Sequence, residues 1–205
     1  ACSPHMLTTE IHDPYETANR QTHAFNKKVD KALIRPAAIG YSRVMNDSIE
    51  TIISNMANNL SVPSHIVNDL LQGELISAVQ NTAKFSINST LGLAGIATPA
   101  ADFGIDGGRS DFGQTLHVWG VGEGAFVELP LLGPSTGRDA VGTAVDYVLN
   151  PVGRLATAQQ QAIATSTRVG SILSRRGQFA ATVDSVLYES ADSYAQMRSI
   201  FLQRR

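Results

Sequence analysis

The chain has 205 residues, of which 43% are apolar and only 17% are charged, and its formal net charge is −2. This balance excludes a general nucleic-acid binder, which needs an excess of positive charge, and the apolar content excludes an intrinsically disordered chain. The length allows one domain or two small ones. A typical soluble domain carries about 25% charged residues, so this chain has few ionic groups with which to cover a surface in water.

The N-terminus carries the only cysteine, Cys2, so an internal disulfide and a zinc site built on thiolates are both excluded. The pair Ala1-Cys2 has the form left when a signal peptide is removed before an acylated cysteine. Residues 1–12 are polar and aperiodic, which predicts a flexible tether after a lipidated Cys2; an incidental cysteine is the alternative. The charge-free stretch that starts at the apolar Phe85 and ends at Ala101 is shorter than the roughly 20 apolar residues of a membrane span.

Capping signals predict four helices in the first ninety residues. The first begins at Asp13-Pro14 and ends at Arg35-Pro36, because the residue before proline avoids the α region. A capping box at 47–50 opens the second. Pro63, in the sequence SVPS, starts the third, and Gly73 ends it. Glu74 opens the fourth.

The second of these helices is amphipathic yet nearly uncharged after its first turn. Ile52 and Met56 belong to its apolar side, and Asn55 and Asn59 to its polar side. Neutral amides, rather than lysine and glutamate, therefore form the polar surface of this helix.

A glycine-rich region follows, from residue 91 to residue 137, and holds eleven of the 17 glycines. The helical period fails there, which predicts a long loop with short extended pieces at Thr115–Trp119 and Ala125–Leu129. Loops of this length are usually functional when they are ordered. Helices resume at Arg138, end at Asn150, and continue from Leu155 until Gly177 breaks the pattern; two more follow. We predict an all-α single domain with a long glycine-rich loop region.

Catalytic motifs are weak. Residues 133–137, GPSTG, match the nucleophile elbow G-x-S-x-G around Ser135, but all five histidines precede this serine, whereas that hydrolase fold places its histidine after it. The competing interpretation is a turn whose Ser or Thr caps the next helix. Gly120, Gly122 and Ala125 fit a dinucleotide fingerprint without the helix it requires. We predict no enzyme activity, no cofactor and no metal site.

Six segments carry a family resemblance. They are DPYETANRQTHAFNKKVDKALIRPA from Asp13, SNMANNLSVP, the LLQG turn at Gly73, FSINSTLGLAG from Phe85, DFGQTLHVWGVGEGAFVELPLLGPSTGRD from Asp111, and the closing DSVLYESADSYAQMRSIFLQRR. They resemble the MlaA (VacJ) lipoproteins of Gram-negative outer membranes. His117 and Ala125 stand where that family is expected to have Gly and Pro, and Glu123 is an unexpected charge.

The resemblance implies a fold and a function. Residues 13–205 would form a ring-like bundle of amphipathic helices around a central channel, anchored through Cys2 in the inner, periplasmic leaflet of the outer membrane. Mislocalised glycerophospholipids would leave the outer leaflet through this channel and pass to a soluble periplasmic lipid carrier, which feeds an inner-membrane ABC transporter. Trimeric porins are the expected outer-membrane partners, with no nucleic acid involved. The alternatives are a serine esterase or lipase using Ser135, and a structural porin-associated lipoprotein.

Two groups of residues are predicted beside the channel. The first is a hairpin at Leu91, Gly92, Leu93, Ala94, Gly95 and Ile96, and the second comprises Trp119, Gly120, Gly122, Gly124 and Phe126. Polar but uncharged helix faces would let a headgroup pass without strong ion pairing, and apolar loop residues would shield acyl chains. Bulky substitution at Gly92 or Gly95 is expected to disturb lipid asymmetry without affecting folding.

Overall fold

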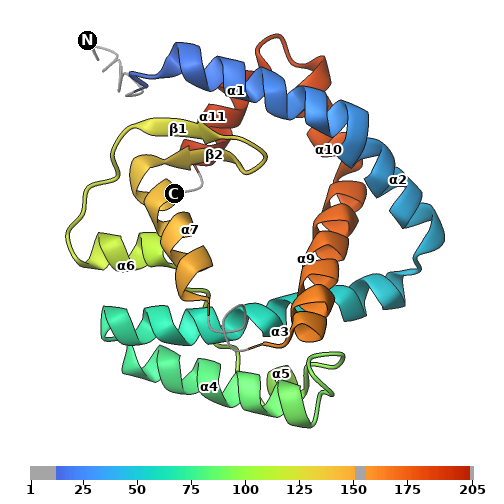
Figure 1. The fold of residues 1–205 in the computed structure, drawn as a ribbon, viewed down its shortest axis with the longest axis vertical. Helices are drawn as coiled ribbons and strands as arrows, with labels where there is room; N and C mark the ends of the chain where they lie inside the picture. Colours follow the sequence, from blue (N-terminus) through green and yellow to red (C-terminus); the bar gives the residue numbers. More distant parts are fainter. Residues whose placement is uncertain (1–12, 151–155, 204–205) are drawn as a thin grey trace, which may run out of the picture.

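The computed structural model describes residues 13–150 and 156–203 and follows a ring-shaped course (Figure 1). One side of the ring consists of α1 (Glu16–Val29), the π-helix η1 (Asp30–Ile34) and α2 (Arg35–Val44); the next elements are α3 (Asp47–Gln72), α4 (Leu75–Thr90), α5 (Pro99–Asp102) and α6 (Phe112–Val118). The strands β1 (Phe126–Leu129) and β2 (Gly133–Thr136) come next, followed by α7 (Gly137–Leu149), α9 (Ala158–Gln178), α10 (Ala180–Asp184), the π-helix η2 (Ser185–Glu189) and α11 (Ser193–Gln203). The predicted all-α single domain is confirmed, with one small hairpin added.

The first helix does not end at Arg35-Pro36, as the sequence predicts, but continues through a π turn. The backbone N–H of Arg35 bonds the carbonyl of Asp30, five residues earlier. This wider turn places Pro36 in the first turn of α2, where its missing N–H needs no partner. The chain therefore changes helical pitch at the proline and runs on to Val44.

The predicted second and third helices are also one helix, α3, with Pro63 in its interior. Its cap is Asn46, whose side chain accepts from the N–H of Ile49 at 2.9 Å, one residue before the predicted Asp47. α3 packs against α4, α6 and α9, and this tertiary packing outweighs the local cost of an internal proline, about 3 kcal/mol. Gly73 ends α3 with φ +78°, as predicted.

The glycine-rich region contains more regular structure than predicted. Residues 112–118 form the helix α6, not an extended piece, because Asp111 caps it through the N–H of Gln114 at 2.8 Å. The extended piece at 126–129 is confirmed as β1, and it pairs antiparallel with β2, in the register Phe126↔Thr136 to Leu129↔Gly133. Figure 1 shows the turn of this hairpin directed toward the inside of the ring.

Gly177 does not break the long C-terminal helix. It lies within α9, at a close approach to Ser42 of α2 that leaves no room for a side chain. Thr157 and Gln160 form a capping box at the start of α9; the predicted start at Leu155 lies outside the described residues. Thr136 caps α7 through the N–H of Asp139, so the predicted Ser/Thr cap of this helix is confirmed.

The distribution of polarity is inverted relative to an ordinary soluble domain. Among the described residues, 18 polar or charged residues are buried, compared with only seven apolar residues. In addition, 27 large apolar side chains are exposed. The largest fully buried side chains are Asn68, Asn81, Thr115, Thr136 and Ser174. Buried polar groups and broad exposed apolar surface are the informative departures from the usual pattern.

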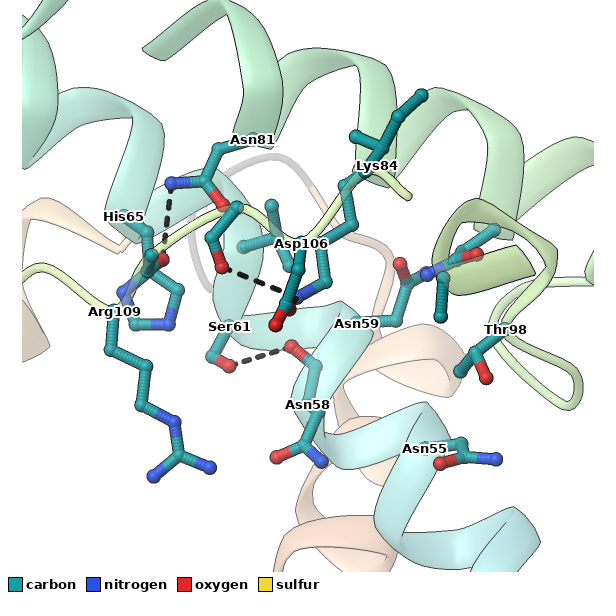
Figure 2. Close-up of a pocket in the computed structure, with 16 residues that line it drawn as sticks. Asn55, Asn58, Asn59, Ser61, His65, Asn81, Lys84, Thr98, Asp106 and Arg109 are labelled. Carbon is teal, nitrogen blue, oxygen red and sulfur yellow. Dashed lines mark hydrogen bonds and ion pairs between the residues drawn. The ribbon is translucent and has the colours of Figure 1, made fainter. Parts of the chain in front are cut away.

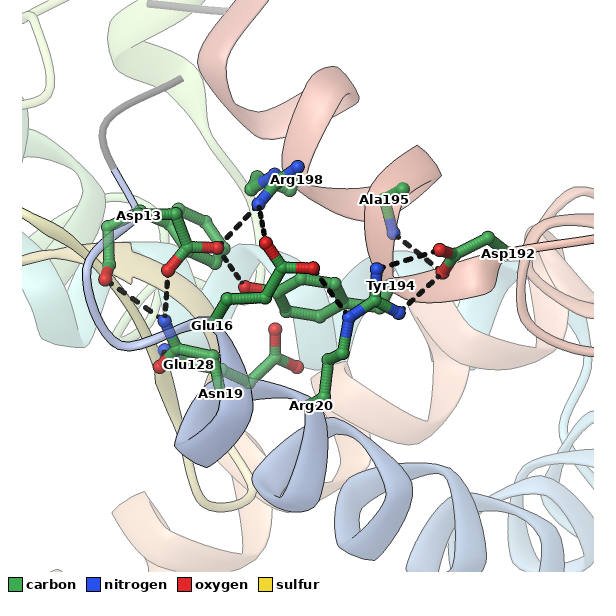
Figure 3. Close-up of polar contacts among 10 residues, drawn as sticks. Asp13, Glu16, Asn19, Arg20, Glu128, Asp192, Tyr194, Ala195 and Arg198 are labelled. Carbon is green, nitrogen blue, oxygen red and sulfur yellow. Dashed lines mark hydrogen bonds and ion pairs between the residues drawn. The ribbon is translucent and has the colours of Figure 1, made fainter. Parts of the chain in front are cut away.

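Hydrogen bonds and ion pairs near the chain ends close the ring. On one side of this closure, Figure 3 shows Asp13 accepting hydrogen bonds from Tyr194 and from Arg198, the latter at 2.5 Å. Asn19 of α1 donates to the carbonyl of Phe126 at 3.1 Å and accepts from the N–H of Glu128 at 2.9 Å. These contacts join α1, β1 and α11 through residues far apart in sequence.

A second charged cluster fastens α9 to the η1 segment. The guanidinium of Arg176 donates to both carboxylate oxygens of Asp30 at 2.9 Å and to Asp184 at 2.6 Å. Arg35 binds the same Asp184 at 2.7 Å. Burial, followed by the hydrogen bond to Asp30, raises the pKa of Tyr188 to about 12, so its hydroxyl remains a donor at neutral pH.

Candidate functional site

Neutral side chains hold α3 against its neighbours. Asn68, buried in α3, donates to Asp146 of α7 at 2.8 Å and accepts from the hydroxyl of Thr115 in α6 at 3.0 Å. Asn81 of α4 donates to Asp69 at 2.7 Å and to the carbonyl of Gly108 at 3.1 Å. Hydrogen bonds of buried amide groups therefore join the helices at this junction, where most helix pairs pack through apolar side chains.

A cavity of about 540 Å³ opens where α3, α4 and residues 98–109 meet. Five asparagines and three basic side chains line its wall, and Figure 2 shows how the labelled ones lie around it. The asparagines are Asn55, Asn58, Asn59, Asn81 and Asn88; the basic residues are His65, Lys84 and Arg109. Asn55 and Asn59 belong to the amphipathic helix singled out in the sequence, and the structure brings both to this wall.

The other two residues named on that helix, Ile52 and Met56, are half-buried in α3. No sequence pattern indicates a role for Arg109 or His65, because neither belongs to a periodic run. His65 is joined to this loop through its Nδ1, which lies 2.6 Å from the carbonyl oxygen of Ser110.

The predicted hairpin at residues 91–96 is a compact series of turns at the end of α4. Leu93 and Ala94 have positive φ values, 51° and 60°, and Leu91, Leu93 and Ile96 are exposed. Gly92 packs so closely that a Cβ would lie 2.5 Å from the carbonyl oxygen of Asn88.

Gly95, with φ +91°, would place a Cβ 2.6 Å from that of Asn59. Real Cβ atoms do not approach other heavy atoms so closely. The expectation that bulk at Gly92 or Gly95 leaves folding intact is therefore corrected: either change must displace this turn.

The second predicted group divides between surface and core. Gly120 and Gly122 border an open depression with Arg138. Trp119 is exposed, and its indole N–H donates to the carbonyl of Leu71 at 3.1 Å. Phe126, in contrast, is 2% exposed and packs against Tyr194 and Phe201.

Phe126 is therefore a core residue and lines no surface. Gly124, with φ +76°, lies beside Gly137, the residue at which the chain passes from β2 into α7.

Ser135 has the surroundings of a structural residue. It is buried in β2, opposite Val127, and its hydroxyl donates to the carbonyl of Thr136 at 3.3 Å. The three described histidines have other partners: His23 contacts Glu128, His65 contacts Ser110, and His117 contacts Arg138. Within residues 13–150 and 156–203, Ser135 thus has no histidine beside it of the kind that a nucleophilic serine requires.

A different serine makes triad-like contacts. His23 Nδ1 lies 3.2 Å from a carboxylate oxygen of Glu128, and its Nε2 lies 3.0 Å from the hydroxyl of Ser193. All three side chains are buried. His23 and Glu128 border a cavity of about 210 Å³ that Ser193 does not line, so this arrangement joins α1, β1 and α11 and presents no nucleophile to a substrate.

Cys2 and residues 1–12 lie outside the described residues, so acylation of Cys2 and the tether remain predictions.

Comparisons with known proteins agree with one another. The family model of the MlaA lipoprotein matches residues 11–205. The chain is 33% identical over 197 residues to an uncharacterized protein of Rickettsia bellii, and 30% identical over 196 residues to the intermembrane phospholipid transport system lipoprotein MlaA of Escherichia coli K12. These alignments cover 96% and 94% of this chain and 76% of each relative.

A solved structure from work on the structural basis of bacterial outer membrane lipid asymmetry matches with a TM-score of 0.77 at 28% identity. This match covers 94% of this chain and 96% of the solved chain. The fold and nearly the whole sequence therefore agree with one family, and the chain belongs to the MlaA lipoproteins.

Proposed function

We propose that this protein is an outer-membrane lipoprotein that removes mislocalised glycerophospholipids from the outer leaflet and so maintains lipid asymmetry. The ring of helices lies in the inner leaflet, and the lipid passes through it along polar but uncharged surfaces. No covalent chemistry is part of this function.

The inverted polarity is the observation that carries the proposal. In lipid, exposed apolar side chains cost nothing, whereas interhelical contacts rely on small and polar residues. This chain combines both features: amide and hydroxyl side chains fill its helix contacts, and large apolar side chains face outward. None of the described helices has the length and apolarity needed to cross a membrane.

The hairpin between β1 and β2 supports the passage. Its turn is directed toward the inside of the ring (Figure 1) and carries Leu131 and Leu132, which are 63% and 68% exposed. Leu131 has φ +65°, and its N–H donates to the side chain of Asn26 at 2.7 Å, which holds the turn against α1. These leucines offer acyl chains an apolar contact beside the polar helix faces.

The partners we propose follow from this role. A soluble periplasmic carrier receives the lipid and delivers it to an inner-membrane ABC transporter, and trimeric porins hold the ring in the outer membrane. Leu75, Ile76 and Val79 form an exposed apolar strip at the start of α4, which suits contact with a barrel wall or with lipid.

The single tryptophan allows a direct test of immersion in lipid. Trp119 is 54% exposed, so its fluorescence should be quenched when the protein is reconstituted into vesicles of brominated phospholipid. A water-soluble quencher should have little effect on the same sample. The reverse pattern would contradict a ring that lies in the leaflet.

Transport itself is tested in cells. Expression of this chain in a Gram-negative strain that lacks its own MlaA lipoprotein should lower the amount of phospholipid that an added phospholipase can reach at the cell surface. A Ser135→Ala variant should work equally well. Loss of rescue in that variant, with normal protein levels, would favour the hydrolase, and an absence of rescue by the wild-type chain would contradict transport.

A further inference from the structure

The cavity between α3, α4 and residues 98–109 has the size of a ligand site. Its volume of about 540 Å³ lies within the roughly 300–1,000 Å³ of small-molecule pockets. Its wall is polar without being acidic: Asp106 is the only carboxylate that lines it. Such a wall offers many hydrogen-bonding groups and little repulsion to an anion.

Counting the charges on the wall gives a surplus of one positive charge. Lys84 already has partners within the protein, because its ammonium group lies 3.3 Å from a carboxylate oxygen of Asp106 and 3.4 Å from the carbonyl oxygen of Gly107. Arg109 is exposed and makes no hydrogen bond or ion pair with any described residue. The charges of Lys84 and Asp106 cancel, and the guanidinium of Arg109 is left over (Figure 2).

A single uncompensated guanidinium matches a single negative charge. A phosphodiester carries one charge, whereas a phosphate monoester carries about 1.5 to 2 at neutral pH. Arginine is well suited to a phosphate group, because its planar fork donates two parallel hydrogen bonds. The charge balance of the wall therefore fits a phosphodiester better than free phosphate.

The same wall also contains an acceptor that lacks a donor. Asn59 is 4% exposed; its amide nitrogen donates to Ser89 at 3.1 Å, while its carbonyl oxygen Oδ1 has no partner within the part of the chain that is described. A buried acceptor without a donor is destabilising, and a ligand hydroxyl or ammonium group would satisfy it. Asp106, whose side chain is 91% exposed, offers a second acceptor for the same group.

Apolar surface lies next to this polar cavity. Asn55, on the wall, donates to the carbonyl of Ile96 at 3.4 Å, and Gly95 packs against Asn59. The turn that contains these two contacts also exposes Leu91 and Leu93, at 68% and 70%. A polar cavity bordered by an exposed apolar turn suits an amphiphile.

We propose that this cavity is a headgroup subsite for glycerophospholipids, in which Arg109 binds the phosphodiester and Asn59 accepts from the hydroxyl or ammonium group beyond it. The turn at residues 91–96 contacts the acyl chains. This proposal rests on the transport function and adds a place, beside the ring, where the headgroup is recognised.

Binding of a short-chain lipid tests the subsite. Isothermal titration calorimetry in detergent solution would measure the affinity for dihexanoyl phosphatidylethanolamine of three proteins: the wild-type chain, Arg109→Gln and Arg43→Gln. Arg43 is a matched control, because it is also an exposed arginine but lies on α2 and does not line the cavity. We expect Arg109→Gln to weaken the affinity about tenfold or more and Arg43→Gln to leave it unchanged.

A second pair of variants tests the charge balance without disturbing buried groups. Asn58 is exposed on the wall, so Asn58→Asp lowers the net charge of the wall from +1 to zero, and Asn58→Gln keeps it. We expect weaker binding of dihexanoyl phosphatidylglycerol by Asn58→Asp only. Equal binding by all these variants would overturn the subsite.

Two further probes separate the possible sources of the phosphate group. Dihexanoylglycerol, which lacks phosphate, should bind much more weakly, and inorganic phosphate at millimolar concentration should not displace the lipid. Displacement by inorganic phosphate would replace the lipid subsite with a free-anion site. If the wild-type chain binds no phospholipid at all, the transport function fails too; if only the Arg109 dependence is missing, the subsite alone fails.

Discussion

The ring is held in two chemically different ways on its two sides. Where α1, η1, α9 and α11 meet, carboxylates and guanidinium groups form ion pairs, as in the contacts of Arg176 with Asp30 and Asp184. Where α3 meets α4, α6 and α7, neutral amide and hydroxyl groups take the place of guanidinium groups as donors, to one another or to a carboxylate, as in the contacts of Asn68 with Thr115 and Asp146. The two sides belong to one closed arrangement (Figure 1), so the difference does not reflect separate domains.

The difference concerns how charges are paired near the proposed lipid subsite. The carboxylates there already have donors, because Asp69 accepts from Asn81 and Asp106 lies 3.3 Å from the ammonium group of Lys84, so the guanidinium of Arg109 is left without a partner among the described residues. Ion pairs on the other side supply orientation and stability without facing that cavity. The two sides should therefore respond differently to removal of a polar group, to added bulk and to pH.

The largest effect is expected from Arg176→Met on the charged side. This change leaves the buried carboxylate of Asp30 without its bidentate partner, and breaking a buried pair from one side costs about 3–5 kcal/mol. Urea unfolding in detergent would measure the loss. Arg175→Met, at an exposed neighbour on the same helix, is the control, and equal stability of the two variants would contradict the assigned role of this cluster.

Added bulk on the neutral side should have the next largest effect. A methyl group at Gly92 meets backbone oxygen atoms of Asn88 and Ala97, so Gly92→Ala must move the turn at a cost of about 2–3 kcal/mol. Gly122→Ala serves as the control, because nothing lies within 4 Å of its Cβ position. A fully stable Gly92→Ala protein would mean that this turn is looser than its packing indicates.

Removing one amide should cost less. Asn68→Leu leaves Asp146 and Thr115 short of a hydrogen-bond partner, which is expected to lower the free energy of unfolding by about 1–2 kcal/mol. The exposed Asn58→Leu should lower it by less than about 0.5 kcal/mol. If Asn68→Leu were as damaging as Arg176→Met, the proposed distinction between the two sides would fail.

Local sequence signals predicted the elements whose ends are set by a cap or a glycine, and missed those set by packing. Gly73 and the Thr136 cap follow from backbone rules that act within a few residues. Pro36 and Pro63 suggested breaks, yet both lie in continuous helical segments. A π turn accommodates Pro36, and packing of α3 against its neighbouring helices offsets the local cost of Pro63. No pattern within α9 indicated that Gly177 serves a contact with Ser42.

The candidate site was predictable only in part, for a similar reason. Asn55 and Asn59 appeared as the polar side of an amphipathic helix, but the residues that complete the cavity come from a loop about fifty positions later. Arg109 has no neighbour in sequence that indicates its role, and its importance follows from the pairing of Lys84 with Asp106. Phe126 was expected near a surface because glycines surround it, whereas its contacts with Tyr194 and Phe201 place it in the core.

The smallest expected effect, and one confined to the charged side, is a loss of stability in acid. The hydrogen bond from Arg20 is the main cause that lowers the pKa of Asp192 to about 2, compared with about 3.9 for a free aspartate. The unfolded chain therefore takes up this proton at a higher pH than the folded one. The stabilisation is complete above about pH 4 and is lost as the pH falls from about 4 to about 2.

Because the Arg20 and Asp192 side chains are 42% and 44% exposed, solvent screening limits the contribution to less than about 1 kcal/mol. Unfolding measurements at a series of pH values should show Arg20→Gln less stable than the wild-type chain at pH 5 and nearly equal to it at pH 2, with the gap at pH 5 shrinking in high salt. Arg43→Gln should show no such convergence. A gap that persists at pH 2 would mean that Arg20 acts through its contact with the ring of Tyr194 and not through its ion pair.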